Sequence, residues 1–440
     1  MTNAWKQTSL TKFMRKHEIY AVIGSLFGDE GKGHTVQLLC EDAIRRGKNP
    51  VVVRFSGGSQ AAHTVSDGKV THICSSYGSG VLDGVDTIVY DSGGFGGVFN
   101  HAYFDPIAAV NERNKLIEEY KLVYPDMKVT LPKIYVSTPC RLITPYDMFN
   151  DRNDNGLLSD GTCGSGQWGC HKRYQTNILF ESISYTMWYE NKPYDYLKTV
   201  RSYYCVPKDV EAEDCFVNAF QKGVFTFVTH DDLQSKLNEY DVVILEGSQG
   251  LLLDADRGFY PHVTSTNVGV EATFSFIKHV LEAEPSDCQY YFVTRTYLTR
   301  HGNGYEPREF FGEEMKRHFL DETTETNKTN QYQGDFKVGF FEPYLFREAF
   351  ARHTLDNLQK KHNLTYNLVI THLDKLYKQP VKFFAQPDNN VVSFWSVDEY
   401  LGHIVKSTAV NFNRVFTTDS PSSEFCEQHL ETKQENSNLS

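Results

Sequence analysis

Residues 18–47 read EIYAVIGSLFGDEGKGHTVQLLCEDAIRRG. The run begins with β-branched and apolar residues that pass into glycine, which is typical of a buried strand that ends in a loop. Its last part, residues 34–47, carries apolar residues at helical spacing and ends at Gly47, a residue type that often terminates helices. The stretch therefore predicts a strand, a glycine-rich loop and a helix, in that order.

The same alternation continues along the chain. Six further short apolar runs predict strands: 49–58, 86–94, 133–139, 240–250, 288–297 and 366–376. Helical spacing occurs between several of them, for example over 107–121 and 342–362. Apolar strands that alternate with helices indicate an α/β fold with a large, mainly parallel β-sheet covered by helices on both faces. Polar loops rich in Gly, Ser and Thr follow the strands, at the edge where such sheets bind ligands.

Length and composition describe an ordinary folded chain. The 440 residues are 40% apolar, and 44 basic against 56 acidic residues give a net charge of −12, which disfavours nucleic-acid binding. No apolar stretch reaches the roughly 18 residues of a membrane helix, and the N-terminus has no secretory apolar core. The nine cysteines are an odd number without a CxxC pair, which favours reduced thiols and a cytoplasmic protein.

The chain shows no internal repeat and no low-complexity linker. We therefore expect a single large domain with inserted loops over residues 18–430. Residues 1–17 read as a polar and basic N-terminal extension, and residues 431–440 read as a polar C-terminal tail.

The loop GDEGKG, residues 28–33, has the composition of an anion-binding site. Its glycines allow backbone N–H groups to turn toward an anion, the following helix adds its positive N-terminal end, and Lys32 supplies a charge. The Walker pattern GxxxxGK[ST] is not met, because Lys32 is followed by Gly33 and His34. Asp29 could ligate magnesium (Mg²⁺) or take a proton from a substrate. On the residues alone, an exposed glycine turn with incidental charges remains the alternative.

Six segments in order resemble the adenylosuccinate synthetase family. They are GDEGKG (28–33), RFSGGSQAAHTV (54–65), GTCGSG (161–166), ILEGSQGLLLDADRGFYPHVTSTN (244–267), YLTRHGNG (297–304) and THLD (371–374). The family patterns that they resemble are GDEGKG, GGxNAGHT, GTTGRGIG, EGAQGxLLDxDxGTYPxVTSSN, YxTRVGxG and TKLD. The resemblance therefore spans residues 21–376, most of the chain.

The resemblance implies a two-step ligation that uses Mg²⁺ and takes place in a homodimer. GTP phosphorylates O6 of IMP, and the amine of L-aspartate then displaces that phosphate. Asp29 would take the purine N1 proton, while Lys32 and His63 would neutralise the transferring phosphoryl group. Gln249 would hold the oxo edge of the purine, and Asp29 with the backbone carbonyl of Ala62 would ligate Mg²⁺. Without the resemblance, His63 reads as a structural histidine and Gln249 as a turn residue.

The resemblance also places the rest of the site. The GTP phosphates are expected against Gly28, Gly31, Gly33 and His34. The purine nucleotide is expected against Gln60, Thr162, Cys163 and Thr264. The family contributes an arginine from the partner subunit, for which Lys172 or Arg173 is the nearest candidate. Asp374 would accept hydrogen bonds from guanine, beside His372, which replaces the family's lysine.

The largest departure from the family concerns the amino acid. The family's loop TTGRRRRTGWLD corresponds here to TNQYQGDFKVGFFE (329–342), in which Lys337 is the one basic residue. Arginines bind carboxylates in pairs of hydrogen bonds, so their loss alters this site. We expect L-aspartate to be held by Thr329, Asn330, Lys337 and Arg300.

Three interpretations therefore remain open. The first is ligation of aspartate to IMP with GTP. The second is the branch of the family that joins aspartate to dGMP with GTP or ATP, whose amino-acid loop is also poor in arginine. That branch tends to carry a small hydroxyl residue where Asp29 stands, so Asp29 favours IMP. The third is a non-catalytic purine-nucleotide-binding protein, which the missing arginines suggest and the intact Asp29, Lys32 and His63 oppose.

Overall fold

The computed structural model describes residues 16–92, 101–155, 161–176, 192–305, 317, 319–320, 332, 334–376, 381–385, 390–394, 396–420 and 423–428. The expected C-terminal tail and all but residues 16 and 17 of the expected N-terminal extension lie outside these ranges.

A ten-stranded sheet forms the centre of the molecule, in the order β18-β17-β14-β11-β1-β10-β2-β5-β7-β9. In chain order the strands are β1 (Glu18–Gly24), β2 (Pro50–Arg54), β5 (Thr87–Val89), β7 (Ile134–Ser137), β9 (Phe225–Val228), β10 (Val242–Glu246), β11 (Cys288–Arg295), β14 (Thr365–Thr371), β17 (Phe412–Thr417) and β18 (Cys426–Gln428). Each neighbouring pair is parallel except β17 and β18. All seven predicted strands lie in this sheet, and the α/β prediction is confirmed.

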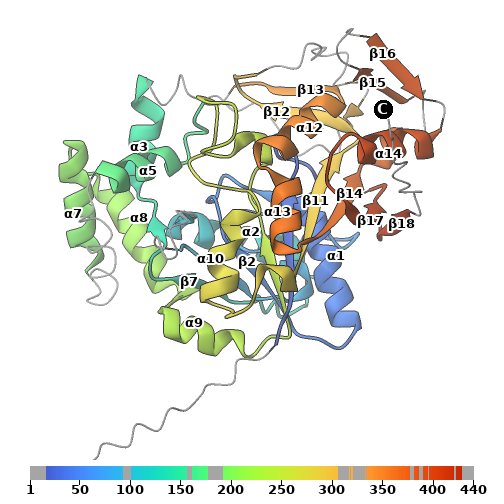
Figure 1. Ribbon diagram of the computed structural model, residues 1–440. Helices are drawn as coiled ribbons and strands as arrows, with labels where there is room; N and C mark the ends of the chain where they lie inside the picture. Colours follow the sequence, from blue (N-terminus) through green and yellow to red (C-terminus); the bar gives the residue numbers. More distant parts are fainter. Residues whose placement is uncertain are drawn as a thin grey trace, which may run out of the picture.

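Helices cover both faces of the sheet (Figure 1). They are α1 (Lys32–Arg45), α2 (Pro106–Val123), α3 (Pro145–Asn153), α5 (Gln167–Thr176), α7 (Pro193–Tyr204), α8 (Val210–Gln221), α9 (His230–Leu237), α10 (Glu271–His279), α12 (Pro343–Arg352), α13 (Leu355–His362) and α14 (Val397–Lys406). The segment predicted as one helix over 342–362 is two helices, because Thr354 is left-handed with φ 48°. None of these described helices has the length and apolarity needed to cross a membrane.

Side chains that alternate along β1 explain why both faces are covered. Ala21 and Ile23 belong to a core that α10, α12 and α13 complete, whereas Val22 belongs to a second core against α1. All three residues are at most 1% exposed. Full burial of a side chain such as Val or Ile contributes about 1.5–3 kcal/mol, so a strand that is apolar on both sides stabilises two layers.

A third core lies beside β7 and includes residues of α2, α5, α7 and α8. The helices α3, α5, α7 and α8 lie on the left side of Figure 1. Four two-stranded sheets lie outside the central sheet. They are β3 (His63–Ser66) with β4 (Thr71–Cys74), β6 (Tyr103–Phe104) with β8 (Arg141–Leu142), β12 (Tyr297–His301) with β13 (Phe336–Phe340), and β15 (Val381–Ala385) with β16 (Asn390–Phe394). The β12–β13 hairpin and the loop before α5 bring residues to the site described next.

Candidate active site

The loops that follow β1, β2, β10, β11 and β14 meet at one edge of the sheet, as expected for the carboxyl ends of parallel strands. Two cavities lie at this edge. The first, of about 430 Å³, contains Gln249 and is called the Gln249 cavity. The second, of about 420 Å³, contains Lys32 and is called the Lys32 cavity. Asp29 and Ala62 line both cavities, so these two residues form a shared wall.

The glycine-rich loop is shaped by left-handed backbone positions. Gly31 caps the N-terminus of α1 with φ 90°, and a Cβ there would lie 2.9 Å from the Thr371 Cγ2 atom. A side chain is therefore excluded by both conformation and space. Asp29 is also left-handed, with φ 54°, which is uncommon for a residue other than glycine. This conformation places its carboxylate between the cavities.

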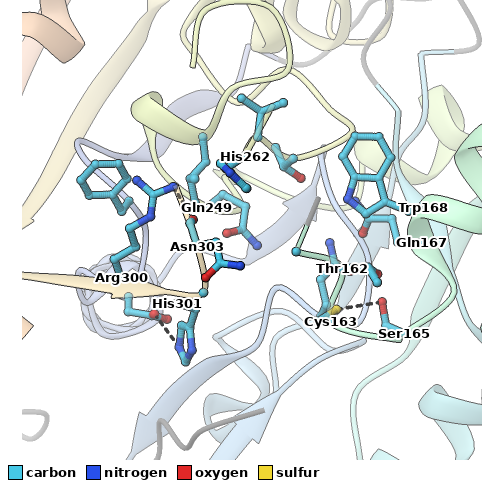
Figure 2. Close-up of a pocket in the computed structure, with 18 of the residues that line it drawn as sticks. Thr162, Cys163, Ser165, Gln167, Trp168, Gln249, His262, Arg300, His301 and Asn303 are labelled. Atoms are coloured by element: carbon cyan, nitrogen blue, oxygen red, sulfur yellow. Dashed lines mark hydrogen bonds and ion pairs between the residues drawn. The ribbon is translucent and has the colours of Figure 1, made fainter. Parts of the chain in front are cut away.

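Asp29 is paired with a histidine from the β12–β13 hairpin. His301 Nε2 lies 3.1 Å from Asp29 Oδ2 (Figure 2). Burial alone would raise the pKa of Asp29, but the hydrogen bond and charge of His301 and the charges of Arg295 and Lys32 lower it to about 2. The carboxyl is therefore ionised at neutral pH and accepts hydrogen bonds without donating them.

Lys32 and Glu30 are buried together beneath the loop, each at most 3% exposed. The Leu26 N–H donates to Glu30 Oε1 over 2.5 Å. Burial raises the pKa of Glu30 to about 8, in spite of the nearby Lys32 charge, and burial lowers the pKa of Lys32. Lys32 lines its cavity, and the carboxylates of Asp29, in the same loop, and of Glu246 favour its ammonium form. An ammonium group in the cavity wall favours an anion there.

His63 is held by the last residue of β10. His63 Nδ1 lies 2.5 Å from Glu246 Oε1, and Glu246 also accepts the Ser79 N–H over 3.0 Å. Burial would raise the pKa of Glu246, but the charge and hydrogen bond of His63 and the charge of Arg54 lower it to about 2. An ionised acceptor fixes the tautomer with hydrogen on Nδ1, so Nε2 is the ring nitrogen left to exchange a proton in the Lys32 cavity.

Most predicted site residues line one of the two cavities. The Gln249 cavity contains Asp29, Gln60, Ala62, Thr162, Cys163, Thr264, Gln249 and Arg300. The Lys32 cavity contains Asp29, Gly31, Lys32, Gly33, His34, Ala62, His63, His372 and Asp374. Gly28 lies beside Gln249, because a Cβ at Gly28 would be 3.4 Å from the Gln249 Cα. Thr329 and Asn330 lie outside the described residues.

Side chains from distant segments face each other across the Gln249 cavity (Figure 2). Arg300, His301 and Asn303 lie on one side, and Thr162, Cys163 and Trp168 on the other. The Thr162 hydroxyl donates to Asp151 Oδ2 over 3.1 Å, and the Cys163 thiol donates to Ser165 Oγ over 3.2 Å.

The prediction that Arg173 reaches a nucleotide phosphate is wrong. Arg173 is fully buried, with Nε 2.8 Å from Asp147 Oδ1 and Nη2 2.9 Å from Asp147 Oδ2. Its Nη1 donates to the Tyr196 hydroxyl over 3.0 Å. A guanidinium used in this way stabilises the third core and cannot extend to a ligand or another subunit. Lys172 next to it is exposed, with Nζ 4.0 Å from Asp154 Oδ2, and its predicted role stays a prediction.

Arg300 is a buried cation in the wall of the Gln249 cavity. It is 1% exposed, packs over the Phe27 ring at 4.5 Å, and donates to the carbonyl oxygens of Tyr305 and Asn303. Its Nε has no hydrogen-bond partner among the described residues. Burial lowers the pKa of Arg300 to about 10. Lys337 stands directly opposite on β13 and is not among the residues that line either cavity. Like charges at paired strand positions repel each other, and a bound anion would relieve that repulsion.

The loop that carries the amino-acid prediction contacts the loop of residues 161–166 through Tyr332. A Cβ on Gly164 would lie 2.5 Å from the Tyr332 Cδ2 atom, so only glycine permits this approach. The Tyr332 ring also lies 5.6 Å from the Arg152 guanidinium carbon. The described part of this loop therefore contacts the loop of residues 161–166 that lines the cavity.

Several residues of the site were missed by sequence reasoning, among them Glu246, His301 and Arg295. Glu246 ends an apolar strand directly before the GSQG turn, and a charged residue in that position was an available signal. His301 stands where the resembling pattern YxTRVGxG has valine. Arg295 ends β11, is 6% exposed, and lines the Lys32 cavity.

An open parallel sheet with a glycine-rich loop, a helix N-terminus and a buried lysine at its carboxyl edge defines a nucleotide-binding α/β protein. The adenylosuccinate synthetase family model matches residues 21–379. The chain belongs to the adenylosuccinate synthetase family.

Curated relatives and solved structures agree with this assignment. The chain is 29% identical to adenylosuccinate synthetase of Chlorobium limicola, over 66% of this chain and 64% of the relative. It is 30% identical to that of Pelodictyon phaeoclathratiforme, over 67% and 65%. The match thus spans just under two thirds of the length of these relatives.

Two solved structures share the fold. The fully ligated adenylosuccinate synthetase from Plasmodium falciparum superposes with a TM-score of 0.63 at 16% identity, covering 93% of this chain and all of that one. The succinoaminodeoxyadenylate synthetase of cyanophage S-2L, bound to dGMP and to dATP as an energy donor, superposes with a TM-score of 0.55 at 14% identity, covering 94% and 96%.

Proposed function

We propose that this protein is a purine nucleotide ligase that joins L-aspartate to C6 of IMP, using GTP and Mg²⁺ and yielding adenylosuccinate. The observation that carries the proposal is the shared wall: Asp29 lines both the Gln249 cavity and the Lys32 cavity. A nucleotide acceptor in the first and a nucleoside triphosphate in the second would meet at this carboxylate. That arrangement suits direct transfer of a phosphoryl group between two bound nucleotides.

In the first step, O6 of IMP forms a bond to the γ-phosphorus of GTP while the bond from that phosphorus to the β-phosphate oxygen breaks. The N1 proton of IMP passes to Asp29, and the electron pair shifts to O6. The low pKa of Asp29 keeps it in the acceptor form. Proton transfer to it becomes easier when a substrate closes the cavity, because burial raises the pKa of a carboxyl. Lys32 and His63 would neutralise the charge on the transferring group.

In the second step, the amine of aspartate attacks C6 and the phosphate formed on O6 leaves. Gln249 lines the purine cavity with an amide that can both donate and accept. Thr162, Thr264 and Gln60 lie in the same cavity and are proposed to hold the ribose and phosphate of IMP. Aspartate would enter on the side of Arg300.

Asp29 and Ala62 offer hard oxygen donors that suit Mg²⁺. The Asp29 carboxyl is ionised, and the Ala62 backbone lies in the wall that both cavities share. A cation held there with the GTP phosphates would supply charge neutralisation during phosphoryl transfer. The protein's own contribution is to position these two oxygens beside Lys32 and His63.

The base of the nucleoside triphosphate is proposed to contact Asp374 and His372. Asp374 lines the Lys32 cavity, with Oδ2 3.1 Å from Lys375 Nζ, and its carboxylate is proposed to accept from guanine N1–H and its 2-amino group. His372 is left-handed with φ 63°, and its ring lies 5.7 Å from that of Tyr297 in an edge-on arrangement. Burial lowers the pKa of His372 well below its usual value, so it presents a neutral ring to the base.

One assay separates the three interpretations. The purified protein is incubated with Mg²⁺, L-aspartate, either GTP or ATP, and either IMP or dGMP, and nucleotide absorbance and released phosphate are followed. We expect product from IMP with GTP. If product forms only with dGMP, the acceptor is dGMP and not IMP. If product forms faster with ATP than with GTP, the phosphoryl donor is ATP. If no combination gives product, the protein is a non-catalytic nucleotide-binding protein.

Replacing Arg300 by methionine should raise the KM for L-aspartate about 10- to 100-fold, because a charged hydrogen bond contributes about 1.5–3 kcal/mol. The KM for IMP should change much less, since aspartate is the ligand proposed beside Arg300. Initial rates at varied aspartate concentration measure the effect. Arg414→Met is the matched control, because Arg414 on β17 pairs with Glu427 on β18 and lines neither cavity. An equal rise in both KM values would contradict the assignment.

The predicted homodimer and the role of Lys172 belong to the same proposal. The Lys172 side chain is 43% exposed. In a homodimer, Lys172 of one subunit is proposed to contact the phosphate of the nucleotide bound by the other subunit. Sedimentation of the protein with and without IMP measures the association directly.

A further inference from the structure

His301 lines the Gln249 cavity and is held by two contacts, one of them with Asp29 in the wall that the two cavities share. Its Nε2 is 3.1 Å from Asp29 Oδ2, and its ring centroid is 4.7 Å from that of Phe336, which pairs with it in register across the β12–β13 hairpin. Phe336 is 3% exposed. The imidazole therefore cannot turn away from Asp29 without leaving a buried aromatic contact.

The pair determines what the Asp29 carboxylate can accept. A carboxylate with both oxygens directed at a purine edge accepts two parallel hydrogen bonds, and guanine offers two donors, N1–H and the 2-amino group. Hypoxanthine offers N1–H alone. His301 occupies Oδ2, which leaves Oδ1 as the oxygen not used in this pair. Hypoxanthine, whose single donor is N1–H, therefore matches a carboxylate that offers Oδ1 to the purine while Oδ2 is paired with His301.

A 2-amino group at this edge would meet the N–H of His301 in place of an acceptor. Two donors that face each other leave one buried donor without a partner, which costs about 10- to 100-fold in affinity. The geometry points to His301 as a specificity-determining residue that selects 6-oxopurine nucleotides without a 2-amino group by occupying one oxygen of Asp29. This inference rests on the proposed function, because it assumes that a purine edge binds at Asp29.

Calorimetric binding of IMP and GMP tests the inference, since these two nucleotides differ only in the 2-amino group. GDP is kept saturating so that the Lys32 cavity is filled. The wild-type protein, His301→Leu and His301→Gln are compared. Leucine removes the donor, whereas the glutamine amide can donate to Asp29 from a position close to that of Nε2. Thermal melts of the three proteins show whether each variant is folded.

We expect the wild-type protein to bind IMP at least tenfold more tightly than GMP. His301→Leu should reduce this ratio about tenfold or more, and His301→Gln should keep most of it. Equal binding of IMP and GMP by the wild type would overturn the inference, as would a ratio in His301→Leu within twofold of the wild-type value. A ratio in His301→Gln as low as in His301→Leu would also overturn it.

The same measurements keep the inference separate from the proposed ligase activity. If the wild-type protein forms no product but the binding ratio depends on His301 as expected, the proposed activity fails and the inference stands. If IMP is converted but the ratio ignores His301, the activity stands and the inference fails.

Discussion

Asp29→Asn should reduce kcat about 10²–10⁴-fold, the usual contribution of a positioned acid or base. The amide retains the shape of the carboxylate, but it cannot take the N1 proton and it lacks the charge that would ligate Mg²⁺. The decrease is measured as the steady-state rate with saturating IMP, GTP and aspartate. IMP binding should persist, because the remaining contacts of the Gln249 cavity are unchanged. Turnover within tenfold of the wild type would remove Asp29 from the proposed mechanism.

Asparagine is a better test than alanine because of the backbone at position 29. Asp29 has φ 54°, a left-handed conformation that asparagine adopts readily and that costs most other residues about 1–2 kcal/mol. Asp29→Ala therefore combines the loss of the carboxylate with strain in the loop. A melting temperature for Asp29→Asn close to that of the wild type would show that the loss of turnover is chemical. A lower melting temperature for Asp29→Ala would report the strain.

The sheet could be predicted because local sequence determines it. Strands such as β1 and β10 are apolar on both faces, which is the pattern of a parallel sheet covered by helices. Two of the strands that were missed have weaker patterns. β9 is only partly buried, and in β17 the polar and exposed Asn413 and Arg414 follow Phe412. A strand whose partner supplies most of its burial leaves little signal in its own residues.

The loops of the site could be predicted for the same reason, but the pairs between them could not. Asp29 and His63 follow successive strands and carry recognisable chemistry. Their partners His301 and Glu246 come from segments far away in the chain, and both pairs exist only because parallel strands end at one edge. Sequence reasoning therefore named the groups that are proposed to react, Asp29 and His63, and missed the residues that pair with them, His301 and Glu246.

Arg173 shows the opposite error. Arg173 was one of two candidates for the arginine that the family contributes from the partner subunit, yet the helical register of α5 turns Arg173 into the core, where Asp147 binds it. Lys172, one position earlier, points to the surface. Successive residues of a helix point in directions about 100° apart. A motif that ends before the helix therefore does not predict which of two adjacent helical residues, here Lys172 or Arg173, faces a ligand.

His63→Ala should lower kcat about 10²–10⁴-fold, and Glu246→Gln should lower it by a similar factor. The reason for the second effect is the tautomer. Glu246 accepts from His63 Nδ1 and from the Ser79 N–H. A glutamine can keep its oxygen on the Ser79 N–H only if its amide group faces His63. Nδ1 must then accept a hydrogen bond, and the ring loses both its orientation for proton transfer and the negative charge that stabilises its protonated form.

The double variant decides whether these residues act as one unit. If Glu246 acts only through His63, His63→Ala with Glu246→Gln should be no slower than His63→Ala alone, because the partner has no further contribution to lose. If the fold-decrease of the double variant equals the product of the two single fold-decreases, Glu246 has a separate role. Normal turnover of Glu246→Gln would contradict the proposal that Glu246 positions His63. GDP binding and melting temperature are the controls for the Lys32 cavity. Glu246 is the last residue of β10 in the central sheet, and His63 is the first residue of β3. Coupling between them would therefore mean that the orientation of His63 depends on a residue of the central sheet.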